Sequence, residues 1–270
     1  MRSSSRLSNV LLKAYAGLVF AFLAAPLVAS LVFSLNSDRY PSLPLGGFST
    51  QWYAELWNDH LVWEGLANTL AVVLVVATAS TFIGFTAAYT VYRHEFTGRS
   101  AYLALALLPP TVPLAIFGLA MLAYLSRLGL SGGLVAVGIS HVVLCAPFAM
   151  AICRLRLLQM DPSLEAAGWN LGAGQWRALS SVIIPFCRPA LLASLFICAA
   201  LSFDEFAVAW FVGGLEETLP VRVLNSLQGQ VSPRINAIGT LVSVMSVALV
   251  LAAQAIMGLA ASRPKQEVQG

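Results

Sequence analysis

The stretch LANTLAVVLVVATASTFIGFTAAYTV, residues 66–91, contains no charged side chain and no proline. A bilayer core about 30 Å thick needs roughly 20 apolar residues in a helix that crosses it. The strands of a membrane barrel are shorter and alternate between apolar and polar residues, whereas this run is continuous. The stretch therefore predicts a transmembrane α-helix.

Five further runs have the same character, and most charged residues lie between them; they cover residues 14–36, 101–125, 133–153, 189–212 and 237–261. The expected fold class is an all-α polytopic membrane protein. Six transmembrane helices would form one permease-like domain over residues 14–261.

Composition supports this class. Of the 270 residues, 59% are hydrophobic and 10% are charged, and the mean hydropathy is +0.81. An average soluble domain has about 25% charged residues, so a cytosolic enzyme and a disordered chain are excluded. A net charge of +3 is too small for a surface that tracks nucleic-acid phosphates. The four cysteines form no CxxC pair and are expected to be small buried hydrophobes.

The first apolar run follows three basic residues and could be taken for a signal peptide. A signal sequence has an apolar region of only about 7–15 residues. This run continues through Phe33, so we expect a retained transmembrane helix.

Basic residues set the orientation. With the N-terminus inside, eleven of them lie on the cytoplasmic side and four outside, the latter being Arg39, Arg127, Arg222 and Arg234. Cytoplasmic segments carry the excess of Lys and Arg. Both termini, residues 1–13 and 262–270, are therefore predicted to be cytoplasmic. The loop 154–188 also lies inside, and the loops 37–65 and 213–236 lie outside.

The inner loop has helix signals of its own. Asp161 suits an N-cap and Pro162 suits the first helical position. Gly172 then marks a bend, and a second helix is expected over residues 173–184, ending before Pro185.

This second helix would place Trp176, Leu179, Val182 and Ile183 on one face. Two short helices joined at a glycine bend could lay their apolar face in a groove on a partner protein. They could also lie on the inner leaflet as an amphipathic segment. The pattern alone leaves both interpretations open.

The inner loop resembles the "EAA" loop of binding-protein-dependent ABC importer permeases. Gly172 is followed by nine residues and then by Val182-Ile183-Ile184-Pro185, in the register of the family's Ile-x-Leu-Pro. The family's Glu-Ala-Ala positions fall on Ala166, Ala167 and Gly168, and Glu165 lies one residue earlier.

Four other segments are similar to the spermidine/putrescine-type permeases, nearest to the second of their two permease chains: residues 48–53, 202–206, 218–222 and 232–237. The resemblance implies the type I ABC importer permease architecture in a bacterial inner membrane. It also implies four partners: a sister permease, two copies of a cytoplasmic ATPase and an outer substrate-binding protein. ATP and Mg would be held by the ATPase, and this chain would bind no cofactor.

The resemblance assigns the inner loop to ATPase coupling. The residues implied are Asp161, Glu165, Ala166, Ala167, Gly168, Gly172, Ala173, Trp176 and Pro185. In this interpretation ATP-driven closure of the partner pulls the loop and opens the permease outward, and hydrolysis resets it.

Two acids, Asp204 and Glu205, are the only ones within a predicted span. A charged side chain within the membrane is energetically unfavourable, so its presence suggests a functional role. Adjacent helical residues point about 100° apart, so one acid would face the substrate pathway while the other caps or pairs structurally, for instance with His141. Together with Phe203 and Trp210 they form the candidate pathway, which would suit a cationic solute such as a polyamine. The alternative is a structural anion near the interface.

Three prolines, Pro109, Pro110 and Pro113, interrupt the third span. Each removes a hydrogen-bond donor, so the helix must kink or break. Such breaks often mark a gate in transporters, and a packed kink without gating function is the alternative.

The sequence contains no Gly-rich P-loop with Lys-Ser/Thr, so energy would come from a partner. No catalytic residue and no metal site are predicted, because the three histidines are scattered. The less favoured classes are a secondary transporter acting alone and an intramembrane enzyme. Within the importer class, the alternative substrates are an aminophosphonate, an opine-like amino-acid derivative and ferric iron.

Overall fold

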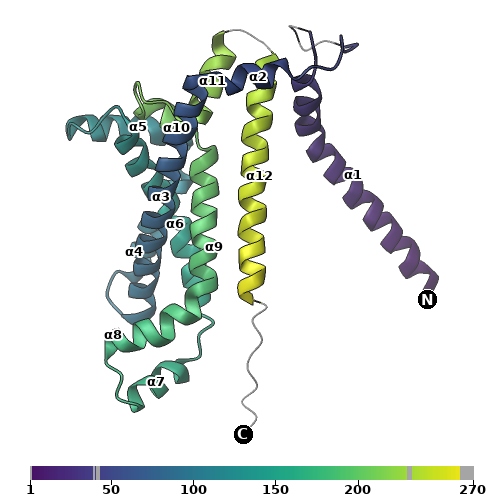
Figure 1. Cartoon of the computed structure of the whole chain (residues 1–270). Helices are drawn as coiled ribbons and strands as arrows, with labels where there is room; N and C mark the ends of the chain where they lie inside the picture. The colour runs from purple at the N-terminus through teal and green to yellow at the C-terminus, as the bar shows by residue number, and fades with distance from the viewer. Residues whose placement is uncertain (1, 39, 41–42, 230–232, 262–270) are drawn as a thin grey trace. The chain divides into compact units, whose positions relative to one another are not determined.

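The computed structural model describes residues 2–38, 40, 43–229 and 233–261. Its regular structure is helical throughout this part of the chain, apart from an isolated bridge between Asn36 and Phe48. The elements (Figure 1) are α1 (Arg2–Ser34), α2 (Gln51–Trp57), α3 (His60–Arg93), α4 (Arg99–Ala106), the 3-10 turn η1 (Pro109–Thr111), α5 (Leu114–Arg127), α6 (Leu134–Leu157), α7 (Pro162–Asn170), α8 (Gln175–Ala178), the π-turn η2 (Leu179–Ile183), α9 (Ile184–Asp204), α10 (Ala207–Val212), α11 (Leu219–Gly229) and α12 (Pro233–Ala261).

Among the described residues, five helical segments are long and apolar enough to cross a membrane: Ser8–Ser34, His60–Arg93, Leu134–Leu157, Gln175–Asp204 and Arg234–Leu251. The remaining predicted span is occupied by α4 and the shorter apolar helix Leu114–Arg127. The predicted all-α membrane fold is therefore confirmed, and the third of its six apolar segments is interrupted.

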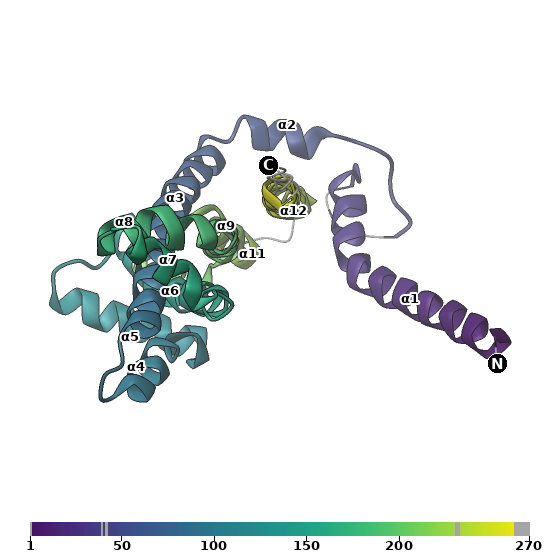
Figure 2. The ribbon, with the colours of Figure 1, turned by 90° about the horizontal axis from the view of Figure 1, so that it is seen from below.

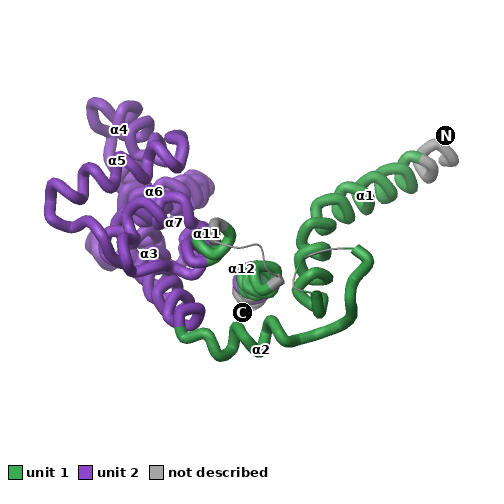
Figure 3. The backbone as a smooth tube through the Cα atoms, turned by 90° about the horizontal axis from the view of Figure 1, so that it is seen from above, with its two compact units in different colours: residues 1–60, 223–245 green, residues 61–222, 246–270 purple. Residues whose placement is uncertain are grey.

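The chain divides into two compact units (Figure 3). The first comprises residues 1–60 and 223–245, and the second comprises residues 61–222 and 246–270. In the first unit, α2 is fastened to the turn that follows α1. The indole N–H of Trp52 donates to the carbonyl of Asn36 at 2.7 Å, and the hydroxyls of Ser34 and Tyr53 lie 2.7 Å apart.

The second unit is built around α6, which packs against α9 and α10, while α10 also packs against α5. At the crossing of α3 and α6 the backbones approach closely. A Cβ atom added at Gly84 would lie 2.5 Å from the Cβ of Ala149, so only glycine allows this contact. Small residues commonly permit such approaches between membrane helices.

The cytoplasmic end of this unit has its own hydrophobic core. The buried members come from α3, α6, the segment after α6, η2 and α9, and they are Phe85, Ala88, Val91, Met150, Cys153, Leu157, Met160, Ile183 and Cys187. All four cysteines of the protein are buried and free, which confirms their interpretation as small hydrophobes. This cluster, which we call the inner core, joins the ends of three long helices to the base of the inner loop.

The structure corrects the second helix of that loop. This helix begins at Gln175 and does not end before Pro185; it passes through η2 into α9 and continues to Asp204. Proline lacks an N–H and clashes with the carbonyl four residues earlier in a regular α-helix. The π-turn directly before Pro185 changes the hydrogen-bond register at this point, and Pro185 then occupies the first turn of α9, where its missing donor is tolerated.

The predicted fifth span, residues 189–212, is likewise not one helix. It is interrupted at Glu205 and Phe206, where α9 ends and α10 begins. The expected break at the prolines of the third span is present, with η1 between α4 and α5.

Candidate functional site

The first candidate site is the docking hairpin, which we define as residues 161–183. It lies at the end of α3, α6 and α9 opposite to α10 (Figure 1), and the view along the bundle shows α7 and α8 across these helix ends (Figure 2). Its first helix begins as predicted. The backbone N–H of Ser163 donates to the carboxylate of Asp161 at 2.9 Å, and this hydrogen bond lowers the pKa of the Asp161 carboxyl.

Gly172 makes the bend between the two helices. Its φ is +77°, in the left-handed region that favours glycine. The N–H of Ala173 donates to the carbonyl of Gly168 at 3.0 Å, and the N–H of Gly172 donates to that of Trp169 at 2.8 Å. This is the Schellman pattern of a helix C-terminus. The bend thus depends on a backbone conformation that other residues adopt only at a cost.

Several apolar side chains of the hairpin are open to the surroundings. Leu171 is 89% exposed and Trp176 is 82% exposed. The residues predicted to share one face of the second helix differ in exposure. Ile183 is fully buried in the inner core, whereas Trp176 projects outward. Leu171 and Trp176 are therefore candidates for contact with a partner protein.

Glu165 lies on the side of the hairpin that faces α3. It is only 6% exposed, and its carboxylate is 3.2 Å from the guanidinium of Arg93 at the end of α3. The same guanidinium lies over the ring of Trp169, 4.6 Å from its centroid. The neighbouring Ala166 and Ala167, by contrast, are exposed. Arg93 was not among the predicted site residues, because no local pattern links it to a loop so far along the chain.

The second candidate site is the break between α9 and α10. The carboxylate of Glu205 accepts hydrogen bonds from the backbone N–H groups of Ala207, Val208 and Ala209 at 2.9 to 3.3 Å. These are donors that the start of a helix leaves free. The Nε2 atom of His141 is 3.3 Å from the same carboxylate. Glu205 therefore has the structural role that one of the two acids was expected to have.

Asp204 is the accessible acid. It is exposed and accepts a hydrogen bond of 2.8 Å from the hydroxyl of Ser246 on α12. Trp210, six residues further on in α10, is 45% exposed and packs edge-on against Phe211. Phe203 is buried, with 2% exposure. Of the predicted pathway residues, Asp204 and Trp210 can thus meet a solute, whereas Glu205 and Phe203 lie in the interior.

The structure also brings together a serine, a histidine and an acid. The hydroxyl of Ser202 lies 2.9 Å from Nδ1 of His141, whose other ring nitrogen faces Glu205. Hydrolases use these residue types for nucleophilic catalysis. Here all three side chains are buried, so no substrate reaches the hydroxyl and the arrangement serves to hold α6 to the helix break.

The proline break leaves its residues accessible. Pro109 and Pro110 form η1, Pro113 precedes α5, and the hydroxyl of Thr111 donates to the carbonyl of Leu108 at 2.7 Å. The same carbonyl accepts the backbone N–H of Thr111 at 2.9 Å, so both donors of Thr111 close this turn. The gating role of these prolines stays a prediction.

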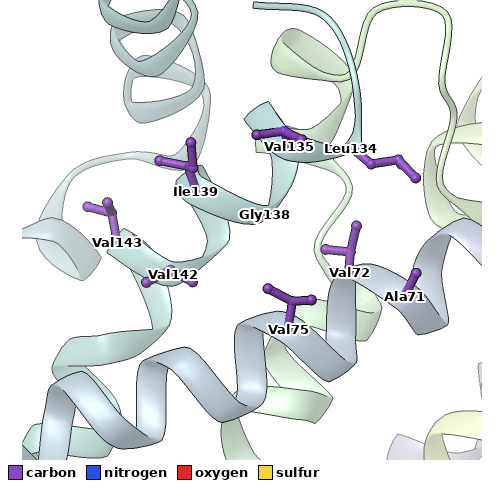
Figure 4. A pocket seen from close by; sticks show the side chains of 9 residues that line it. All are labelled: Ala71, Val72, Val75, Leu134, Val135, Gly138, Ile139, Val142 and Val143. Carbon is purple, nitrogen blue, oxygen red and sulfur yellow. The ribbon is translucent and has the colours of Figure 1, made fainter. Parts of the chain in front are cut away.

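A cavity of about 420 Å³ lies between α3 and α6 (Figure 4). Its walls carry only apolar residues, which are Ala71, Val72, Val75, Leu134, Val135, Gly138, Ile139, Val142 and Val143. A site for a polar solute needs a few convergent polar groups, and these walls offer none. Within the described part of the chain, no cluster of three or more His, Cys, Asp or Glu residues could hold a metal ion.

Comparison with known proteins places this geometry in a family. Residues 80–266 match the family model described as "binding-protein-dependent transport system inner membrane component". This match includes both the docking hairpin and the break at Asp204.

Several characterised relatives align over most of the chain. The spermidine/putrescine transport system permease protein PotC of Haemophilus influenzae is 30% identical over 244 residues, which cover 90% of this chain and 95% of the relative. PotC of Escherichia coli K12 is 31% identical over 242 residues, or 88% and 90% of the two chains. The putrescine transport system permease protein PotI of Escherichia coli K12 is 29% identical over 231 residues, or 83% and 82%.

Solved structures share the fold at lower identity. A chain of a bacterial ABC transporter that imports the acidic polysaccharide alginate has a TM-score of 0.70 at 20% identity, covering 94% of this chain and 96% of the other. A chain of the MetNI methionine ABC transporter has a TM-score of 0.63 at 21% identity, covering 76% and 97%. The family match, the long alignments and the shared fold agree. The chain therefore belongs to the family of binding-protein-dependent transport system inner membrane components.

Proposed function

We propose that this chain forms one half of the translocation pathway of an ATP-driven importer for a polyamine such as spermidine or putrescine. As a family member it is a permease subunit of the inner membrane without catalytic chemistry of its own. The observation that carries the proposal is the exposed carboxylate of Asp204 at the break between α9 and α10, in a chain whose long alignments include permeases named for spermidine and putrescine.

The chemistry of Asp204 suits this cargo. A polyamine carries several ammonium groups, and among the described residues the carboxylate of Asp204 has a neutral serine hydroxyl as its partner, so it offers an opposite charge. The exposed ring of Trp210 adds an aromatic face, and cations bind such faces with about 0.5–2 kcal/mol. The buried Glu205 is occupied by helix N–H groups and would not exchange them for a passing solute.

Energy would reach this site from a partner. The proposal assigns ATP and Mg to two copies of a cytoplasmic ATPase, and cargo delivery to an outer binding protein. The second half of the pathway would come from a sister permease chain. The exposed apolar side chains of the docking hairpin, led by Leu171 and Trp176, suit a groove on the ATPase.

One helical path joins the two candidate sites. The segment Gln175–Asp204 runs through α8, η2 and α9 over 30 residues, or about 45 Å at 1.5 Å per residue. Trp176 lies near its cytoplasmic end and Asp204 is its last residue. A movement imposed on the docking hairpin is thereby conveyed directly to the helix break. Alternating access then follows, with closure of the ATPase opening the pathway outward and hydrolysis resetting it.

Uptake by proteoliposomes tests the proposal. The permease is reconstituted with its operon-encoded partners, and ATP-dependent uptake of labelled spermidine is measured for the wild type, D204N and D204E. We expect D204N to reduce uptake at least about tenfold, as expected when a charged partner worth about 1.4 kcal/mol is lost, and D204E to retain part of it. Unchanged uptake in D204N would refute the role of Asp204.

The same vesicles discriminate between substrates. A labelled aminophosphonate, opine-like amino-acid derivative and ferric iron are each offered in place of spermidine. ATP-dependent uptake of one of them, together with no ATP-dependent spermidine uptake by the wild type, would replace the polyamine as the cargo.

A further inference from the structure

Arg93 links α3 to the docking hairpin through two contacts. Its Nη1 atom is 3.2 Å from Oε1 of Glu165, and the two side chains are 28% and 8% exposed. Its guanidinium also lies over the ring of Trp169 at 4.6 Å from the centroid. Neither contact belongs to the exposed apolar surface formed by Leu171 and Trp176.

Both contacts are on one face of α7. Glu165 and Trp169 are four residues apart, so they lie above one another on the helix. Ala166 and Ala167 point away from that face and are exposed. α7 thus has an inner face held by Arg93 and an outer face without acidic groups.

The pairing makes the Glu165 carboxylate unavailable to another protein. Separating a buried ion pair leaves an uncompensated charge, which is strongly unfavourable. An arginine that binds a carboxylate while it stacks on an aromatic ring is also held more firmly than a lysine would be. Glu165 is therefore used within the chain.

Arg93 sits at the end of a helix that is anchored in the inner core. Val91 and Ala88 of α3 are buried there beside Ile183 of η2 and Cys187 of α9. The hairpin is consequently joined to the long helices by the continuous chain into α9 and by the packing of Ile183 in this core. Arg93 adds a polar connection from α3 to α7. α3 in turn contacts α6 closely at Gly84.

We propose that Arg93 is a positioning residue that conveys movement of the docking hairpin to α3 through Glu165 and Trp169. This inference rests on the proposed coupling role of the hairpin. Without Arg93 the hairpin still offers its exposed apolar side chains to the ATPase, but α7 is no longer held to α3 and its movement is conveyed less completely. ATP is then hydrolysed with less transport.

A double-mutant cycle tests the proposal in the reconstituted complex. The variants are R93Q, E165Q and R93Q/E165Q, with R99Q as a matched control from the same cytoplasmic edge. Two quantities are measured, namely ATP hydrolysed per spermidine imported and the amount of ATPase retained on purification. Neutralising both partners leaves no unpaired charge. The double variant can therefore be measured even where a single variant folds poorly.

We expect R93Q and E165Q each to raise the ATP consumed per imported molecule by about fivefold or more, the lower range of allosteric coupling. The double variant should be no worse than either single variant, because residues that act as a pair are not additive. ATPase retention should stay at the wild-type level, and R99Q should behave as the wild type.

Three results would overturn the proposal. An unchanged ratio in both single variants would make the pair a local contact only. Additive defects in the double variant would mean that the residues act separately. Loss of the ATPase in E165Q but not in R93Q would assign the glutamate to the partner protein. If the wild type imports no spermidine yet retains its ATPase, the cargo is wrong, and hydrolysis stimulated by the binding protein replaces uptake as the readout for the cycle.

Discussion

Replacing Gly172 by alanine perturbs the bend of the docking hairpin without adding a steric clash. No heavy atom lies within 4 Å of a Cβ built at this position, so the whole effect comes from the φ of +77°. An L-residue in the left-handed region costs about 1–2 kcal/mol. This energy corresponds to a factor of roughly 5–30 in the population of the correctly turned hairpin.

The expected result of G172A is a matching loss of ATPase binding and of ATP-dependent uptake, because only the turned hairpin presents Leu171 and Trp176 together. The assay measures retained ATPase on purification and uptake in proteoliposomes.

The chain offers two controls for this substitution. Gly129 ends α5 with the same pattern, a φ of +70° and open space around its Cβ, but it lies on the outer side. G129A therefore carries the same backbone strain away from the ATPase. Gly174 has an extended backbone with φ −71°, so G174A adds no left-handed strain and should cost less than G172A. Equal losses in G172A and G129A, or full activity in G172A, would refute the role of the bend.

Two further outcomes follow from the same geometry. E205A removes the acceptor for the N–H groups at the start of α10 and the carboxylate that faces Nε2 of His141. The midpoint of thermal unfolding in detergent should therefore fall, with a loss of about 1–3 kcal/mol; an unchanged midpoint would contradict the capping role. The lowered pKa of Asp161 means that its cap stabilises α7 above the ordinary pKa of 3.8 and is lost only as the pH falls through the lowered value. Titration of Asp161 should therefore cause no change in ATPase retention between about pH 6 and 8. D161A should reduce ATPase retention at every pH, whereas D161N, which keeps an acceptor, should not. Equal losses in D161A and D161N would show that the cap is not the cause.

The long helices were predictable because each is encoded locally. Twenty or so consecutive apolar residues can satisfy their backbone only as a helix in a bilayer, and the stretch 66–91 falls inside α3 as expected. The start of α7 was predictable for the same reason, since Asp161 and Pro162 act on their immediate neighbours.

The helix break at Glu205 was not predictable from its apolar surroundings. It depends on a carboxylate that turns to accept helix N–H groups and on His141 from α6, some sixty residues earlier. The continuation through Pro185 was missed because proline usually ends a helix, whereas η2 accommodates it here.

The two acids illustrate the same limit. The sequence placed Asp204 and Glu205 side by side and predicted different roles for them, but only tertiary contacts decide which is which. Glu205 meets His141 and Asp204 meets Ser246. The role of Arg93 was unpredictable for the same reason, because more than two helices separate it in the chain from its partner Glu165.

Coupling of this chain to an ATPase through the docking hairpin can be tested directly. The protein is expressed with its native operon, tagged at the C-terminus and purified in mild detergent, and the co-purifying subunits are quantified by mass spectrometry. We expect an ATPase and a second permease in a ratio of two ATPase copies to one of each permease. A homo-oligomer without any ATPase would contradict this coupling and would favour a transporter that works alone.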